Sequence, residues 1–141
     1  MVIYIIAKPD VYWLIKRNKE WEKLEKLGHV AVFSYDYYDE HAEYNAKKSH
    51  YYGPWKAKKM EETEEIIRKA DAVLVLNYSI DKYNRKEAIT TKMFLELYEA
   101  HKNNKPIYCM NYFEESPFEA EAMAFNPITV NSIFEEIKYK L

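Results

Sequence analysis

Five short runs of apolar and β-branched residues, separated by longer polar stretches, limit most strongly what this chain can fold into. They span residues 2–7, 30–33, 72–76, 106–110 and 128–130. The longer runs lack the alternation of apolar and polar residues that is typical of a strand with one solvent-exposed face. They are typical of strands buried on both faces, as in parallel sheets. The chain therefore predicts a sheet that is covered on both sides.

Helical spacing of apolar residues fills the stretches between these runs. We expect helices over residues 10–27, 54–70, 88–103, 116–125 and 132–141, and a long loop over residues 34–53. In the two longest helices, the residues expected to face inward are Met60, Thr63, Ile67 and Ala70, and Met93, Leu97 and Ala100.

Strands that alternate with helices predict a three-layer α/β/α sandwich. We expect a flavodoxin-like parallel sheet of five strands in the order 2-1-3-4-5, in one domain over residues 1–141. In such sheets a ligand binds outside the carboxyl ends of the strands. The residues expected at those ends are Ala7, Lys8, Asn77, Tyr78 and Asn111. The asparagines could bind a ligand or cap a turn, and Tyr78 could stack on a base or only pack.

Composition removes several classes of function. The net charge of −2 gives no broad basic surface for a nucleic acid polymer. No apolar stretch is long enough to span a membrane and the first residues lack signal-peptide features, so a cytoplasmic protein is expected. The four histidines have no metal-like spacing, and there is no P-loop or glycine-rich dinucleotide motif. We therefore expect neither a metal nor a cofactor.

Tyrosine is unusually frequent, with 14 residues, many of them between positions 35 and 55. Rings with a polar tip suit a half-buried surface, so this segment predicts a subunit interface in a homodimer or larger assembly, or a ligand rim. Ordinary packing is the other interpretation. Lys56, Lys58 and Lys59 precede several glutamates and are interpreted as a solvated helix face of mixed charge.

One carboxylate is placed where it could do chemistry. Glu96 lies about two turns into the expected helix 88–103. Helical side chains lean toward the N-terminus, which directs Glu96 back toward the strand ends. A carboxylate there can displace a base from the anomeric carbon of a sugar. The alternative is an exposed helical glutamate. Asp71 begins the third strand at the opposite end and is interpreted as structural.

The order of several segments resembles the nucleoside 2-deoxyribosyltransferase-like family. Residues 26–30 and 69–78 are similar to the second and third strands of that family, and residues 105–108 to its next strand. Phe94-Leu95-Glu96 falls where the family has its catalytic glutamate. Residues 119–128 resemble the acidic helix and proline turn of its smaller members. Together these segments cover most of residues 24–131.

Two segments of the family pattern differ in this chain. The family's Gly-Ser pair after the first strand is Ala7-Lys8 here, and its Gly-Gly-Asn before the glutamate is Thr90-Thr91-Lys92. Glycines let backbone amides approach a ligand closely, so the threonines are expected to fill part of the site. Lys8 and Lys92 could bind a phosphate or be surface lysines.

The resemblance implies an enzyme that transfers or hydrolyses the N-glycosidic bond of a small nucleoside or deoxynucleotide. Glu96 would be its nucleophile and would face a concavity at the carboxyl ends of the first, third and fourth strands. The substrate-binding residues would be Ala7, Lys8, Asn77, Tyr78, Thr90, Thr91, Lys92 and Asn111. The alternative is a non-catalytic relative that binds a nucleotide or a partner protein through segment 35–55. The base, the need for a 5′-phosphate, and transfer against hydrolysis stay open.

Overall fold

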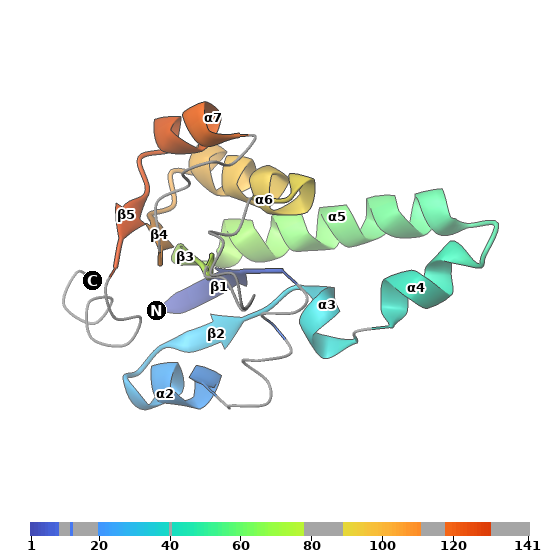
Figure 1. The fold of residues 1–141 in the computed structure, drawn as a ribbon. Coiled ribbons are helices and arrows are strands. Elements are labelled where there is room, and N and C mark those ends of the chain that lie inside the picture. The colour runs from blue at the N-terminus through green and yellow to red at the C-terminus, as the bar shows by residue number, and fades with distance from the viewer. Residues whose placement is uncertain (9–11, 13–19, 40, 78–88, 111–117, 131–141) are drawn as a thin grey trace, which may run out of the picture.

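The core of the protein is a five-stranded parallel sheet (Figure 1). The computed structural model describes residues 1–8, 12, 20–39, 41–77, 89–110 and 118–130. Its strands are β1 (Val2–Ile6), β2 (Val30–Val32), β3 (Ala72–Val75), β4 (Ile107–Cys109) and β5 (Ile128–Thr129). Their order is β2-β1-β3-β4-β5 and every pair is parallel, which confirms the flavodoxin-like order.

Helices cover both faces of the sheet and complete the three-layer sandwich (Figure 1). Helix α2 (Glu20–Lys26) lies on one face, and α5 (Tyr52–Lys69), α6 (Thr91–Lys102) and α7 (Glu119–Ala124) lie on the other. Two short helices, α3 (Tyr35–Tyr38) and α4 (Ala42–Lys47), connect β2 to α5. No helix in the described part of the chain is long and apolar enough to cross a membrane.

Alternation along β1 separates two hydrophobic cores. Ile3 and Ile5 point to the α2 side, whereas Tyr4 and Ile6 point to the side of α5 and α6. All four are essentially inaccessible to solvent, as expected for a central strand of a parallel sheet. Tyr4 is the one of these residues that brings a polar group into its core.

The expected loop over residues 34–53 is wrong, because this segment forms α3, α4 and the start of α5. A network around one carboxylate holds these helices together. Glu43 accepts hydrogen bonds from the hydroxyls of Tyr35 and Tyr52 and pairs with Lys56 of α5. Helix α5 begins two residues before Pro54, which lies in its first turn, where proline is tolerated.

Most inward-facing helical residues are as expected, with one correction. Thr63, Ile67, Ala70, Met93, Leu97 and Ala100 are buried. Met60 was expected inside but is 41% exposed, because α5 extends beyond the sheet and Met60 borders a cavity rather than the core. The expected helix 132–141 and most of the first half of the expected helix 10–27 lie outside the described residues.

Helix α6 has well-defined ends that fix where its side chains point. The hydroxyl of Thr90 accepts a hydrogen bond from the Met93 amide at 3.2 Å and caps the N-terminus. The helix ends at Lys102, before Asn104, which has a positive φ of 55°. The caps place Glu96 in the second turn, on the side that faces α5.

Candidate functional site

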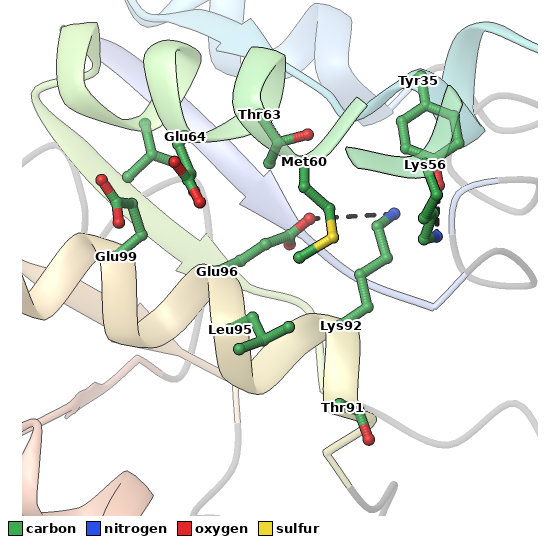
Figure 2. A pocket seen from close by; sticks show the side chains of 11 residues that line it. Tyr35, Lys56, Met60, Thr63, Glu64, Thr91, Lys92, Leu95, Glu96 and Glu99 are labelled. Carbon is green, nitrogen blue, oxygen red and sulfur yellow. Dashed lines mark hydrogen bonds and ion pairs between the residues drawn. The ribbon is translucent and has the colours of Figure 1, made fainter. Parts of the chain in front are cut away.

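A cavity of about 290 Å³ lies between α5 and α6, on the sheet face to which Tyr4 points (Figure 2). Its described lining comes from three helices. The lining residues are Tyr35 of α3; Lys56, Met60, Thr63, Glu64 and Ile67 of α5; and Thr91, Lys92, Leu95, Glu96 and Glu99 of α6. Because α5 and α6 run side by side, the lining forms two rows along the length of the cavity.

Glu96 is the buried carboxylate near the middle of this cavity (Figure 2). It is only 5% exposed, and the hydroxyl of Tyr4 donates a hydrogen bond to its Oε1 at 3.0 Å. The ammonium of Lys92 lies 3.9 Å from the same oxygen. Burying a carboxylate is costly unless hydrogen bonds and opposite charge offset the loss of water. The hydroxyl and the lysine supply both, and they fix the orientation of the carboxylate.

Two lysines gather around Tyr35 at one end of the cavity. Lys56 Nζ donates to the Tyr35 hydroxyl at 2.9 Å, and Lys92 Nζ lies 4.9 Å from the centre of the Tyr35 ring. Lys92 also donates to the hydroxyl of Ser34 at 3.2 Å. Hydrogen bonds from Tyr52 and Lys56 outweigh the effect of burial and lower the pKa of Glu43, so it stays charged beside Lys56. This end of the cavity therefore carries two positioned ammonium groups.

The opposite end of the cavity carries two carboxylates, Glu64 and Glu99. Glu99 is almost fully buried and forms ion pairs with Arg68 at 3.3 Å and Lys102 at 2.9 Å. Burial alone would raise the pKa of Glu99, but hydrogen bonds from Lys102 and Asn103 hold it below its ordinary value. The charge of Lys56 is thus balanced by Glu43 and that of Glu99 by Arg68 and Lys102, with Glu96 between the two ends of the cavity.

Three of the expected site residues line the cavity: Glu96, Thr91 and Lys92. Thr91 is exposed at the start of α6 and does not cover Glu96. Thr90 is not among the described lining residues, and its side chain caps the helix.

Other expected residues lie elsewhere. Ala7 packs in the core on the opposite face of the sheet. Lys8 is half-buried outside the lining, with its carbonyl bonded to the Tyr12 amide. Asn77 is buried and accepts a hydrogen bond from the Met110 amide at 3.0 Å, so it joins the ends of β3 and β4. Tyr78 and Asn111 lie outside the described residues. Asp71 is structural, as expected, since it binds the Val2 amide at 2.8 Å.

Glu96 faces a concavity, and the described part of its lining runs along α5 and α6; segments 9–11, 78–88 and 111–117, which follow β1, β3 and β4, lie outside the described residues. Only one end, with Tyr35 and Thr91, is at the carboxyl edge of the sheet. Neither Tyr4 nor the α5 wall was expected at the site from the sequence. Tyr4 had a visible signal, since it is the only polar-tipped residue in an otherwise aliphatic strand. Lys56 was assigned to a solvated face because pattern alone does not show that α3 and α4 fold back over α5.

Within the described residues, no three histidine, cysteine, aspartate or glutamate side chains are grouped so that they could hold a metal ion. Lys92 pairs with Glu96 within the lining, whereas Lys56 pairs with Glu43 and Glu99 pairs with Arg68 and Lys102 next to it. The arrangement can do two things chemically. It can present a carboxylate to an electrophilic carbon, and it can bind a ligand with an anionic end.

Fold and site define a class: a parallel α/β sandwich in which a buried carboxylate faces a helix-lined cavity. No family model and no curated protein matches the sequence. Among solved structures, the chain is similar to the 2-deoxyribosyltransferase from the psychrotolerant bacterium Bacillus psychrosaccharolyticus. The two are 18% identical, with a TM-score of 0.50, over 77% of this chain and 71% of that one. At this identity the similarity shows a common fold.

Proposed function

We propose that this protein breaks the N-glycosidic bond of a nucleoside or nucleotide, with Glu96 as the nucleophile. The observation that carries the proposal is the position of the Glu96 carboxylate, which is buried, fixed by Tyr4 and open to the cavity. The shared fold with a 2-deoxyribosyltransferase and the family resemblance around Phe94-Leu95-Glu96 support the same chemistry.

The reaction needs two steps at one carbon. In the first, a Glu96 oxygen forms a bond to the anomeric carbon while the carbon–nitrogen bond breaks, and the electron pair leaves with the base, which takes up a proton. In the second, water or another base attacks the same carbon and Glu96 departs as a carboxylate. Tyr4 holds Oε1 throughout, so the carboxylate does not have to reorient between the steps. No cofactor takes part in this scheme.

The size of the cavity supports a small-molecule substrate. A volume of about 290 Å³ is near the lower end of the range for small-molecule sites. The apolar walls formed by Met60, Ile67 and Leu95 suit the faces of a base or sugar, while the charged groups can fix its orientation. A polymer does not fit this space.

One observation favours a second candidate, a non-catalytic nucleotide-binding relative. The Lys92 ammonium lies 3.9 Å from Glu96 Oε1 and offsets the charge that a nucleophile needs. In this reading the Glu96–Lys92 pair is part of a binding wall and no bond is broken.

The test is base release measured by chromatography on a panel of ribo- and deoxynucleosides and their monophosphates. We expect Glu96→Gln to lower the rate by about a thousandfold or more, because the amide is a poor nucleophile. Glu99→Gln is the matched control, since it removes another buried carboxylate of the same cavity one turn further along α6. It should stay within about tenfold of wild type.

Each outcome decides between the candidates. If the wild type is inert on the whole panel but a nucleotide raises its melting temperature, the binding relative is correct. If no compound reacts and none binds, both candidates are wrong. Equal losses in Glu96→Gln and Glu99→Gln would show that cavity charge matters and that Glu96 has no special role.

A further inference from the structure

The charged residues of this chain are unevenly distributed, and one exposed end of the molecule is basic. Residues 44–60 contain five lysines and no acidic residue, although the net charge of the whole chain is −2. This segment forms most of α4, the turn after it and the first half of α5, which project beyond the sheet (Figure 1). The overall charge therefore does not describe this end of the molecule.

Exposed lysines and tyrosines occur together on this projection. Six exposed side chains make up a surface that we call the α4–α5 tip: Tyr44, Lys47, Lys48, His50, Tyr51 and Lys58. Tyr44 is 62% exposed and Tyr51 is 74% exposed. Lys58 follows Tyr51 by seven residues, so it lies about two turns further along the same side of α5. Positive charge and accessible rings thus alternate along the tip.

The three lysines of the tip have no carboxylate partner among the described residues, whereas the other two lysines of segment 44–60 do. Two of the three lie against tyrosine rings instead. The Lys48 ammonium is 4.4 Å from the centre of the Tyr44 ring, and the Lys47 ammonium is 6.0 Å from that of Tyr52. The positive charge of the tip is therefore available to an anionic partner.

We propose that the α4–α5 tip binds single-stranded nucleic acid. Proteins bind such strands through positive side chains along the phosphates and through aromatic rings on which bases stack, without reading a sequence. The tip supplies both kinds of group. No other ring and no ammonium lies over Tyr51 among the described residues, so its ring is accessible to a base.

Other anionic partners match the tip less well. An acidic protein surface would pair with the lysines but would not need the face of the Tyr51 ring. A membrane of anionic lipids would attract the lysines, but none of the six side chains is aliphatic and able to enter the acyl layer. A single strand is the partner that uses both the charge and the rings.

The backbone that carries the tip is held in place by hydrogen bonds. Glu43 of α4 accepts a hydrogen bond from the Tyr52 hydroxyl and pairs with Lys56, which fixes α4 against α5. In the turn between them, the Tyr51 amide donates to the Ser49 hydroxyl at 3.0 Å. An ordered backbone lowers the entropy that is lost when a partner binds.

The tip is separate from the cavity, since none of its six residues is among the described lining. The inference therefore does not depend on the proposed function. Tyr44 and Tyr51 are also the rings that a second copy of the chain would cover, so a bound strand competes with self-association.

The experiment measures fluorescence anisotropy of a labelled oligothymidylate of about 20 nucleotides as the protein is added. We expect the single strand to bind at least about tenfold more tightly than a duplex of the same length, because paired bases cannot stack on a tyrosine. The logarithm of the binding constant should fall with the logarithm of salt concentration with a slope of about −2, as expected for three lysines on a single strand.

Variants test the two kinds of contact separately. Tyr51→Ala should lower the affinity about 5- to 100-fold, the effect of losing one base–ring stack. Lys48→Gln and Lys58→Gln should each make the salt slope shallower by about 0.7. Tyr98→Ala on α6 and Lys26→Gln on α2 are the matched controls, since both side chains are exposed outside the tip, and they should change neither quantity.

Three results would overturn the inference. One is equal affinity for the single strand and the duplex. Another is a Tyr51→Ala variant that binds as wild type does, with circular dichroism showing that it is folded. The third is displacement of the oligonucleotide by polyglutamate, or binding to phosphatidylserine vesicles, at least as tight as binding to the oligonucleotide, because the tip would then recognise charge alone.

Discussion

Replacing Tyr4 by phenylalanine removes one buried hydroxyl and keeps the ring that packs in the core. The hydroxyl donates to Glu96 Oε1 at 3.0 Å, and both residues are essentially buried. A hydrogen bond to a charged group contributes about 1.5–3 kcal/mol to the free energy of unfolding. We expect Tyr4→Phe to cost that amount, and for a chain of this length to lower the melting temperature by about 5–12 °C.

The assay is urea denaturation followed by circular dichroism, with Tyr108→Phe as the control. Tyr108 is a buried tyrosine on the other face of the sheet, and its hydroxyl has no hydrogen-bond partner among the described residues. We expect Tyr108→Phe to change stability by less than about 0.5 kcal/mol, because no buried partner loses a hydrogen bond.

A double-mutant cycle with Glu96→Gln tests the reason for the effect. A glutamine still accepts the hydrogen bond, but a neutral bond contributes only about 0.5–1.5 kcal/mol. Tyr4→Phe should therefore cost less in the Glu96→Gln background than in wild type. The same cost in both backgrounds, or a wild-type cost no larger than that of Tyr108→Phe, would refute the role of the hydroxyl in holding a buried charge.

Three further predictions follow from the same structure. Thr90→Ala removes the N-cap of α6 and should cost about 1 kcal/mol in urea denaturation, whereas Thr90→Ser should retain most of the stability. The pKa of Glu99 is lowered in the folded state, so its contribution is complete above the ordinary value of 4.5 and is lost as the pH falls through the folded pKa. Stability measured from pH 5 to 3 should therefore fall more steeply in wild type than in Glu99→Gln. Tyr44 and Tyr51 are strongly exposed, and we predict a homodimer or larger assembly that their replacement by serine weakens; a monodisperse wild-type monomer in sedimentation velocity at micromolar concentration would contradict this.

The parallel sheet could be predicted from the sequence because its strands are apolar runs, which indicate burial on both faces. Val73 and Leu74 point to opposite faces of the sheet and are both apolar and buried. A continuous run of apolar residues of this kind is stable only in a strand whose two faces are both covered by helices. The segment around Glu43 gave no such signal. Its short helices depend on hydrogen bonds from Tyr35, Tyr52 and Lys56, which are up to 13 positions away in the chain, and no local period encodes contacts of that kind.

For the candidate site, the position of Glu96 could be predicted from the sequence, but the α5 wall of the cavity could not. Glu96 was found because helical geometry fixes how a side chain on α6 is directed relative to the sheet. Lys92 was included because Thr90-Thr91-Lys92 stands where the resembled family has Gly-Gly-Asn. The roles assigned to Ala7 and Thr90 assumed that the ligand lies over the strand ends. The described lining of the cavity runs along the helices, because α5 is long enough to form a second wall. The length of α5 therefore determines the shape of the cavity. Hydrophobic periodicity predicts that a helix exists better than it predicts where the helix begins and ends.

Helix α5 also connects the wall of the cavity to α3 and α4 (Figure 1). Its C-terminal half is fixed to the sheet through Ile67, whereas its N-terminal half carries α3 and α4 beyond the edge of the sheet (Figure 1). From Ile67 to Lys56 the helix extends about 16 Å, so a tilt of about 10° around Ile67 would move Lys56 by about 3 Å. A molecule that bound α4 and tilted α5 would therefore change the width of the cavity without contacting its lining.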